Sequence, residues 1–207
     1  MKIIFATTNE GKLKEIKAIL SMFDIQVTSL KDENINIEIE ETGKTFEENA
    51  IIKAKTIMKL SGKIVMADDS GLEVDYLNKE PGIYSARYLG ENAPQKMKNE
   101  SIIKRLSQAE GESRSARFVC SIATAFPNGK ILTTEGTLEG LIAYEEKGCS
   151  GFGYDPILYV PEYDQTTAQM SGEQKNKISH RYQALRLMGN KLMSELNGGI
   201  YENFGGK

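Results

Sequence analysis

Basic clusters, long apolar runs and paired cysteines are all missing from this chain of 207 residues. The 26 Lys and Arg residues against 29 Asp and Glu residues give a net charge of −3, which argues against a partner such as a nucleic acid polymer. No stretch approaches the ~20 apolar residues of a membrane helix, and the N-terminus lacks the features of a signal peptide. We therefore expect a cytoplasmic protein with no membrane partner.

Cysteine and histidine are scarce, which limits the available chemistry. Cys120 and Cys149 stand alone, without zinc or redox spacing, so we expect reduced thiols. His180 is the only histidine, and no nucleophile motif accompanies it, which disfavours Ser–His or Cys–His catalysis. The remaining composition, 40% hydrophobic and 27% charged, is that of an ordinary globular chain.

The first residues predict a strand, a loop and a helix. An apolar run at residues 2–7 precedes Thr8-Asn9-Glu10-Gly11-Lys12, and apolar residues at helical spacing follow. Such a loop presents backbone N–H groups and a lysine at a helix N-terminus, where phosphate oxygens are favoured. Simple helix capping explains the same residues, and without other observations it is the preferred interpretation.

Residues 33–41 alternate between apolar and polar, which predicts a half-buried strand with Ile35, Ile37 and Ile39 on one face. The acidic face is most simply a solvated one. The sharper interpretation is that Glu40, beside a turn, reaches a divalent cation.

A helix is expected next. Thr45 and Glu48 fit a capping box ahead of an apolar stripe, and Gly62 is the expected stop. Lys53 and Lys55 lie off the stripe, which favours exposure to solvent. The alternative for Lys53 is that it leans over a cleft.

The most unusual stretch runs from Ile64 to Gly71, where an apolar run meets Asp68-Asp69-Ser70-Gly71. It predicts a short buried strand that stops at two carboxylates, a place where α/β proteins commonly put their chemistry. Successive strand side chains point to opposite faces, so we expect Asp68 and Asp69 to have different tasks, one in a cleft and one in the scaffold. A plain turn is the alternative.

The middle of the chain indicates antiparallel strands. Phe118 to Phe126 predicts a long strand, residues 127–130 a hairpin turn into 131–134, and Thr137 to Ile142 one more strand. The expected fold class is therefore α/β with a mixed sheet. No linker interrupts residues 1–207, so we expect a single domain, with a flexible tail at 197–207.

A second unusual stretch, residues 148–156, places glycines around two aromatics and a carboxylate. Glycine lets the backbone approach a ligand closely, and Phe152 offers a flat face for stacking on a base. An aromatic plug over the core is the alternative. His180 and Arg181 precede an amphipathic helix and form a donor pair suited to carbonyl or phosphate oxygens.

Carboxylates near predicted strand ends and scattered cations are the catalytic groups on offer. Oxygen ligands such as Glu40, Asp68 and Asp69 favour Mg²⁺ or Mn²⁺ over zinc, and Mg²⁺ binds through one or two carboxylates plus substrate phosphates. The combination indicates metal-assisted attack of water on a phosphoanhydride, with a carboxylate as general base.

Seven motifs, in order between about Lys2 and Leu196, resemble the inosine triphosphate pyrophosphatases. The motifs are Thr7–Lys12, Glu40–Gly43, Thr45–Ala50, Ala67–Leu72, Pro81–Tyr88, Gly151–Pro156 and Ile178–Arg181. The resemblance implies an elongated, twisted, mixed β-sheet flanked by helices, with two lobes around a central substrate cleft, and a homodimer. It also implies Mg²⁺-dependent hydrolysis of ITP, dITP and XTP to the monophosphate and pyrophosphate, which removes deaminated purine nucleotides from the pool.

The resemblance also assigns roles to single residues. Asp69 is the base and, with Glu40, the metal site, while Ser70 contacts substrate and His180 with Arg181 reads the purine. The other implied substrate ligands are Thr7, Thr8, Asn9, Glu10, Gly11, Lys12 and Lys175 for the triphosphate, with Lys53 as a weaker candidate, and Phe152, Gly153, Tyr154 and Asp155 for base and sugar. Gln169 and Gln174 depart from the family pattern, in which glutamates are common.

Two other functions fit the sequence less well. A Maf-like nucleotide pyrophosphatase shares the fold but acts on other bases. A nucleotide-binding regulator without activity is the alternative from a different class, and the intact Lys12, Glu40 and Asp69 argue against it.

Overall fold

The structure, a computed structural model, describes the backbone of residues 1–202 and the side chains of residues 1–195. Its internal contacts divide the chain into two compact units that alternate along the sequence. Unit 1 comprises Met1–Asp69, Ser121–Glu135 and Arg181–Lys207, and unit 2 comprises Ser70–Cys120 and Gly136–His180.

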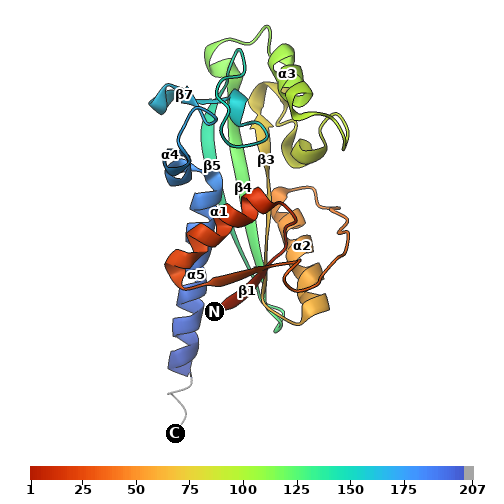
Figure 1. Cartoon of the computed structure of the whole chain (residues 1–207), viewed down its shortest axis with the longest axis vertical. Helices are drawn as coiled ribbons and strands as arrows, with labels where there is room; N and C mark the ends of the chain where they lie inside the picture. The colour runs from red at the N-terminus through yellow and green to blue at the C-terminus, as the bar shows by residue number, and fades with distance from the viewer. Residues whose placement is uncertain (203–207) are drawn as a thin grey trace. The chain divides into compact units, whose positions relative to one another are not determined.

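The elements follow one another as Figure 1 shows. Those within unit 1 are β1 (Lys2–Phe5), α1 (Glu10–Leu20), the 3₁₀ helix η1 (Ser21–Phe23), β2 (Gln26–Ser29) and α2 (Phe46–Ser61). Three strands contribute residues to both units: β3 (Val65–Val74), β4 (Ser115–Ala125) and β5 (Ile131–Ile142). Unit 2 adds η2 (Asp75–Leu77), η3 (Gly82–Arg87), α3 (Gln95–Arg105), η4 (Gly111–Arg114), η5 (Asp155–Ile157), β6 (Leu158–Val160), η6 (Pro161–Tyr163), β7 (Gln165–Thr166) and α4 (Gly172–Ile178). The last helix is α5 (His180–Glu202).

The described strands form one mixed sheet in the order β2-β1-β3-β4-β5-β6-β7. β1 pairs in parallel with β2 and with β3, whereas β6 pairs antiparallel with β5 and β7. This confirms the α/β class and the mixed sheet expected from the sequence. In the part of the chain that is described, none of the helices is long and apolar enough to cross a membrane.

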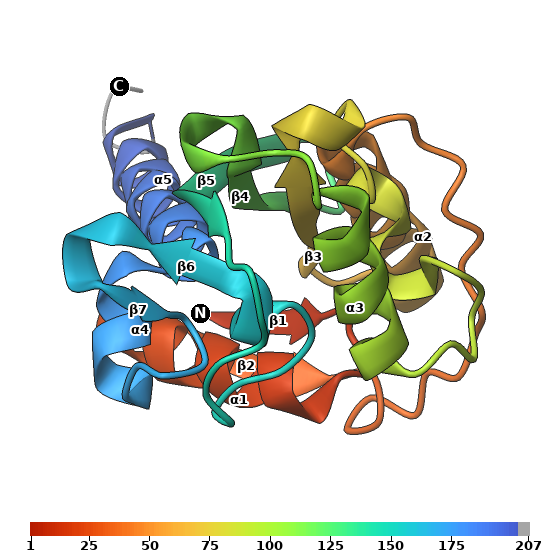
Figure 2. The same ribbon diagram turned by 90° about the horizontal axis from the view of Figure 1, so that it is seen from above.

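Alternation along the strands gives each face of the unit 1 sheet its own helix. Val65 and Ala67 of β3 pack in a cluster with Ala50 and Ile57 of α2. α5 packs instead against η1, which follows α1: a Cβ on Gly189 would lie 2.6 Å from the ring of Phe23. Figures 1 and 2 both show α2 and α5 on opposite sides of β3. The alternate residues of β3, whose side chains point away from the face that carries Val65 and Ala67, therefore face the side on which α1 and α5 lie.

β3 does not stop at its carboxylates, which corrects the predicted turn. It is a continuous strand of 10 residues through Asp68-Asp69-Ser70-Gly71. The strand continues because Leu72 and Val74 are fully buried in the core of unit 2, so the alternation of buried side chains does not end at Gly71.

Two other strand predictions are also corrected. Residues 33–41 are not a strand: Ile35 and Ile39 pack against the unit 1 core, but Ile37 is 39% exposed and the backbone is irregular. The apolar alternation there comes from two side chains that reach the core, and not from a ladder. The strands expected at 131–134 and 137–142 are parts of the single strand β5.

Most helix ends match the expectations. Thr45 Oγ1 accepts a hydrogen bond from Glu48 N at the start of α2, and Gly62 ends that helix in the left-handed conformation. The apolar face of α5 includes the buried Leu185, Met188 and Leu192, while the side chain of Leu196 lies outside the described residues. Residues 197–202 of the expected flexible tail belong to α5, and residues 203–207 lie outside the described part of the chain.

Candidate active site

In unit 1, β1 ends at Phe5, which pairs with Met66 of β3. α1 leads the chain from β1 to β2 on one side of β1, and α2 leads it to β3 on the other side. In open α/β sheets, ligands bind outside the carboxyl ends of the strands where the strand order reverses in this way. The hydrogen bond from Ala6 N to Met66 O, at 2.8 Å, lies just beyond the end of β1, and the next residues of β3 are Ala67, Asp68 and Asp69. The two carboxylates thus lie where the parallel strands end, although β3 itself continues.

Asp68 and Asp69 point to opposite faces of β3. Asp68 has the parity of Met66 and contacts residues of α1 and α5, whereas Asp69 has the parity of Ala67 and contacts residues of α2. The prediction that the two neighbouring carboxylates have different surroundings is confirmed.

Asp68 is a buried carboxylate between two cations. Its Oδ2 accepts a hydrogen bond from Lys12 Nζ at 2.8 Å and lies 3.8 Å from Arg181 Nη2. Arg181 Nη1 donates in turn to Glu15 Oε2 at 2.8 Å. Burial by itself would raise the pKa of Asp68, but the charges of Lys12 and Arg181 outweigh it and hold this pKa well below the ordinary value. Asp68 is therefore a permanent anion that fixes the positions of two cations.

Asp69 has the opposite electrostatic setting. It is 8% exposed, and Lys53 Nζ donates to its Oδ1 at 2.8 Å while Asn49 Nδ2 donates to its Oδ2 at 3.2 Å. Burial raises the pKa of Asp69 above the ordinary value, and the nearby charge of Glu41 adds to this rise against the opposing effect of Lys53. A carboxylate with a raised pKa is better suited than an ordinary one to take a proton from water.

Lys53 joins Asp69 to a second carboxylate. Its Nζ also donates to Glu41 Oε1 at 2.8 Å, and its side chain is only 13% exposed. The expectation that Lys53 faces solvent is therefore wrong, and the alternative orientation toward the site is correct. Lys55 is exposed, as expected.

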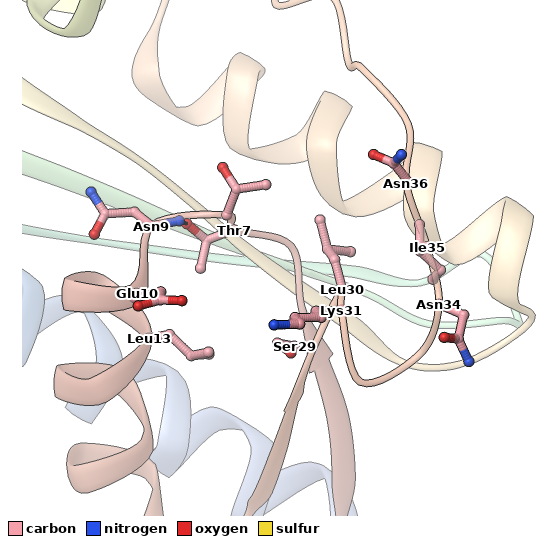
Figure 3. A pocket seen from close by; sticks show the side chains of 11 residues that line it. Thr7, Asn9, Glu10, Leu13, Ser29, Leu30, Lys31, Asn34, Ile35 and Asn36 are labelled. Carbon is pink, nitrogen blue, oxygen red and sulfur yellow. Dashed lines mark hydrogen bonds between the residues drawn. The ribbon is translucent and has the colours of Figure 1, made fainter.

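A cavity of about 510 Å³ adjoins the loop between β1 and α1 (Figure 3). Its lining comes from two segments of unit 1 and includes four of the predicted triphosphate ligands. The lining residues are Thr7, Thr8, Asn9, Glu10, Leu13, Ser29, Leu30, Lys31, Asn34, Ile35 and Asn36. Gly11 lies in the first turn of α1, and Asn9 Oδ1 accepts a hydrogen bond from Lys12 N at 3.0 Å, so the capping interpretation of this loop is confirmed. The side chain of Lys12 reaches Asp68 instead of the cavity.

In unit 2, Asp155 organises the glycine-rich segment. Its Oδ2 accepts hydrogen bonds from Lys175 Nζ at 2.6 Å and from Phe152 N at 2.8 Å, and its Oδ1 accepts one from Thr167 Oγ1 at 2.8 Å. A Cβ on Gly151 would lie 2.9 Å from Asp155 Cγ, so this close approach requires glycine. The structure thus joins Asp155 and Lys175, which the motifs place in different parts of the substrate site.

The aromatic residues of this segment differ in exposure. The ring of Phe152 is 42% exposed, with Lys175 Nζ 5.2 Å from its centroid, so Phe152 is no plug over the core. Tyr154 is buried, and its hydroxyl donates to Ser85 O at 2.8 Å. Phe152 is therefore partly exposed to solvent, while Tyr154 is held in the scaffold.

The remaining predicted residues have mixed surroundings. Gly153 O accepts a hydrogen bond from Asn99 Nδ2 at 3.4 Å, and the ring of His180 packs against Phe118 with 5.0 Å between centroids. Ser70 is half-buried on β3. Glu40 is exposed, and within the described residues no hydrogen bond or ion pair joins it to Asp69.

The structure therefore gathers the predicted residues in two groups. In unit 1, Lys12 and Arg181 both contact Asp68, the neighbour of Asp69. In unit 2, Lys175 and Phe152 both contact Asp155.

Sequence reasoning missed Asn49, Glu41 and Glu15. Asn49 and Lys53 are four residues apart on α2, so they share a face of that helix beside its apolar stripe. A polar pair at this spacing is a signal that the sequence already contains. Glu15 and Arg181 are 166 residues apart, and no local pattern links them.

The two glutamines that depart from the family pattern still accept hydrogen bonds. Gln169 Oε1 accepts one from Thr166 N at 3.0 Å, and Gln174 Oε1 accepts one from Ser171 N at 3.1 Å in a capping box. An amide oxygen can accept these bonds as a carboxylate can, although it carries no charge.

Comparisons with known proteins agree over nearly the whole chain. The model of the Ham1 family matches residues 3–191. A dITP/XTP pyrophosphatase from Bacillus licheniformis is 52% identical over 185 residues, which cover 89% of this chain and 94% of that protein. A dITP/XTP pyrophosphatase from Clostridium perfringens is 47% identical over 203 residues, which cover 95% and 98%. The Ham1 protein of Staphylococcus aureus superposes with a TM-score of 0.86 at 45% identity, covering 94% of this chain and 100% of that one. The resemblance indicated by the ordered motifs is thereby confirmed, and this chain belongs to the Ham1 family.

Proposed function

We propose that this protein is a nucleoside triphosphate pyrophosphatase that hydrolyses deaminated purine nucleotides, namely dITP, ITP and XTP, to the monophosphate and pyrophosphate. Relatives that align with most of the chain are named dITP/XTP pyrophosphatases. The reaction removes these nucleotides from the pool. These names do not support the alternative of a Maf-like pyrophosphatase. The lysines that contact Asp68 and Asp69 argue against a nucleotide-binding regulator without activity.

The setting of Asp69 is the observation that carries this proposal. Its two oxygens accept hydrogen bonds from Lys53 and Asn49, and burial raises its pKa. An oriented carboxylate whose proton affinity is increased is a general base for a water molecule that attacks phosphorus. Asp68, with its lowered pKa, keeps the cations in place and does not compete for that proton.

Lys12, Lys53 and Lys175 are proposed to bind the triphosphate. Lys12 and Lys53 of unit 1 and Lys175 of unit 2 now each contact a carboxylate. Phosphate oxygens form charge-assisted hydrogen bonds of the same kind, so substrate can replace or share these partners. The loop from Thr7 to Lys12, at the N-terminus of α1, adds backbone donors.

The purine is proposed to contact Phe152, Gly153, Tyr154, Asp155, His180 and Arg181, with Ser70 as a further substrate contact. Hypoxanthine and xanthine carry a 6-oxo acceptor where adenine carries an amino donor. Donors from His180 and Arg181 would therefore reject adenine, because a buried donor that faces another donor loses its hydrogen bond.

We propose Mg²⁺ as the cofactor, with Mn²⁺ as a substitute and Glu40 and Asp69 as ligands. A cation is already held beside Asp69, because Asp69 and Glu41, the neighbour of Glu40, share the ammonium group of Lys53 at 2.8 Å from each. In the described part of the chain, no group of three or more His, Cys, Asp or Glu side chains is arranged to hold a metal ion. Substrate oxygens would complete the ligand set, as is usual for Mg²⁺. When bound, the ion supplies positive charge that polarises the phosphoanhydride.

We also propose that the protein acts in the cytoplasm as a homodimer. Its substrates are free nucleotides, and Cys120 and Cys149 are not joined by a disulfide, as is common in a reducing compartment. The dimer follows from the resemblance to the family, and light scattering of the purified protein measures it.

The activity is tested by release of pyrophosphate from a panel of standard and deaminated nucleotides with Mg²⁺, coupled to inorganic pyrophosphatase. ITP and XTP should be hydrolysed much faster than ATP. Asp69→Asn should lose about 100-fold or more of the rate, the usual contribution of a general base, while the protein stays folded.

A matched variant controls for the change of Asp to Asn. Asp24 is exposed, and its left-handed conformation, with φ of 53°, is one that Asn also adopts, so Asp24→Asn should keep full activity. Equal turnover of ATP and ITP, or an unimpaired Asp69→Asn variant, would refute the proposed function.

A further inference from the structure

One buried amide in unit 1 links the two segments that carry the candidate catalytic carboxylates. Asn49, in the first turns of α2, is 0% exposed. Its Oδ1 accepts a hydrogen bond from Gly43 N at 2.8 Å, and its Nδ2 donates to Asp69 Oδ2 at 3.2 Å. Gly43 is the last residue of the irregular acidic segment Glu40-Glu41-Thr42-Gly43, which keeps the name of the turn expected there from the sequence. A single side chain thus connects this turn to Asp69 on β3.

The chemistry of the two partners fixes the orientation of the amide. A backbone N–H group only donates, and an ionised carboxylate only accepts, so the oxygen of Asn49 must face Gly43 and its nitrogen must face Asp69. Aspartate is similar in shape but has no donor for Asp69, and leucine offers neither group. The position therefore requires both halves of a short amide.

Asn49 and Lys53 together hold both oxygens of Asp69. They are four residues apart on α2, so they project from the same face in consecutive turns. Lys53 binds Oδ1 and Asn49 binds Oδ2, which leaves the carboxylate plane little freedom to rotate.

The hydrogen bond between Gly43 and Asn49 depends on glycine at position 43. A Cβ on Gly43 would lie 2.6 Å from Asn49 Oδ1, 2.8 Å from Glu48 Cβ and 2.9 Å from Asn49 N. Glu48 Cβ and Asn49 N belong to the first turn of α2 and cannot move aside alone. The absence of a side chain at Gly43 is what allows the turn to approach α2 closely enough for the hydrogen bond.

From these contacts we propose that Asn49 is a positioning residue of the hydrolytic reaction. It orients the carboxylate of Asp69 and ties the turn that carries Glu40 and Glu41 to that carboxylate. The inference rests on the proposed function, since it assigns Asp69 the role of base. Asn49 acts through Asp69, and the proposal gives it no contact with the nucleotide.

Three variants test the two hydrogen bonds that the Asn49 side chain makes. Asn49→Ala removes both hydrogen bonds. Asn49→Asp keeps an oxygen for Gly43 N but places a second negative charge against Asp69. Gly43→Ala leaves the amide intact and pushes the turn away from it.

The kinetic test measures kcat and KM for ITP in each variant. Loss of a partner that orients a reacting group typically costs about 10–100-fold in activity, so kcat should fall by this amount in Asn49→Ala and at least as far in Asn49→Asp. KM should change little, because the nucleotide contacts are intact. Gly43→Ala should lower kcat too, and it should add little to Asn49→Ala because both changes break the same link.

A control glycine is available in α4. A Cβ on Gly172 would meet no atom within 4 Å, so Gly172→Ala should keep the wild-type kcat. Wild-type kcat in both Asn49 variants, or a loss that appears only in KM, would overturn the proposal. Should an Asn49 variant fail to fold, Gly43→Ala, which keeps the amide and adds no buried charge, tests the same link.

A second readout does not depend on activity. Hydrogen exchange of the Gly43 amide, followed by NMR, should be at least about 10-fold faster in Asn49→Ala than in wild type, because the amide loses its acceptor. It should stay close to wild type in Asn49→Asp. Unchanged exchange in Asn49→Ala would overturn the link. A wild-type protein that hydrolyses no nucleotide would refute the proposed function instead, and exchange would still decide whether Asn49 holds the turn.

Discussion

At the scale of single residues, one peptide unit separates two carboxylates with opposite electrostatics. Asp68 faces Lys12 and Arg181, and its pKa is lowered. The pKa of Asp69 is raised by burial and by the charge of Glu41, against the opposing effect of Lys53. Because strand neighbours point to opposite faces, the sheet itself separates the two environments. A protein can therefore place a fixed anion and a candidate base at adjacent positions.

The raised pKa of Asp69 has a defined consequence for stability. A group that binds its proton more tightly in the folded state stabilises the fold at low pH, and this contribution is lost as the pH rises through the folded pKa. Asp68, whose pKa is lowered, contributes in the opposite sense: its stabilisation is present above the ordinary pKa of Asp and is lost as the pH falls below it.

Substitutions around Asp69 should move its pKa in opposite directions. Glu41→Gln removes a like charge and leaves Lys53 to Asp69 alone, so the pKa should fall. Lys53→Met removes the opposing cation, so the pKa should rise by about 1–3. Carbon-13 NMR of the Asp69 carboxyl group in the metal-free protein measures both. Lys55→Met, on the exposed side of α2, should leave the titration unchanged. A shift of the same sign in Glu41→Gln and Lys53→Met would contradict this electrostatic account.

At the scale of elements, β3 shows why a motif can be recognised and its geometry still mistaken. A strand that meets Asp-Asp-Ser-Gly suggests a turn, because glycine commonly turns the chain. Here Gly71 remains extended within β3, and its missing side chain makes room for Ser85 of η3. Ser85 Oγ accepts a hydrogen bond from Leu72 N at 2.9 Å and donates to Gly82 O at 2.6 Å. The glycine serves a close approach between β3 and η3.

Gly71→Ala should therefore destabilise the protein. The added Cβ would contact Ser85 Oγ and would lie 2.6 Å from Gly82 O and 2.9 Å from Ser85 Cβ, so the backbone of η3 would have to move. Overpacking of this kind costs about 1–3 kcal/mol, measurable by urea unfolding. Gly172→Ala, where nothing lies within 4 Å, should be neutral. An equal free energy of unfolding for the two variants would show that η3 can shift without a measurable loss of stability.

The elements and motifs were predictable to the extent that their signals are local. Asn9 and Thr45 cap helices, Gly62 ends one, and the apolar face of α5 follows its periodicity. The strand predicted at residues 33–41 was wrong because alternation reports which side chains are buried and not whether a partner strand exists. Within the site, the opposite settings of Asp68 and Asp69 followed from strand parity. The pairs Arg181 with Glu15 and Lys175 with Asp155 join segments far apart in sequence, so no local rule yields them.

At the scale of the whole molecule, the chain passes repeatedly between its two units. Unit 1 is made of three separate segments and unit 2 of two, and β3, β4 and β5 each continue from one unit into the other. Neither unit is a contiguous piece of sequence. If one of these strands loses its order in one unit, its hydrogen bonds to neighbouring strands are also disturbed where it enters the other unit. We therefore propose that the single domain expected from the sequence unfolds as one cooperative unit.

We therefore predict one thermal transition in scanning calorimetry, with equal calorimetric and van't Hoff enthalpies. Gly71→Ala strains unit 2, and Gly189→Ala strains unit 1, where a Cβ would lie 2.6 Å from the ring of Phe23. Because the three shared strands couple the units, each substitution should shift the same single transition to lower temperature without broadening it. Two transitions, one sensitive only to Gly71→Ala and the other only to Gly189→Ala, would show that the units unfold independently. In that case the continuous strands would act as tethers between two domains and would not transmit stability from one to the other.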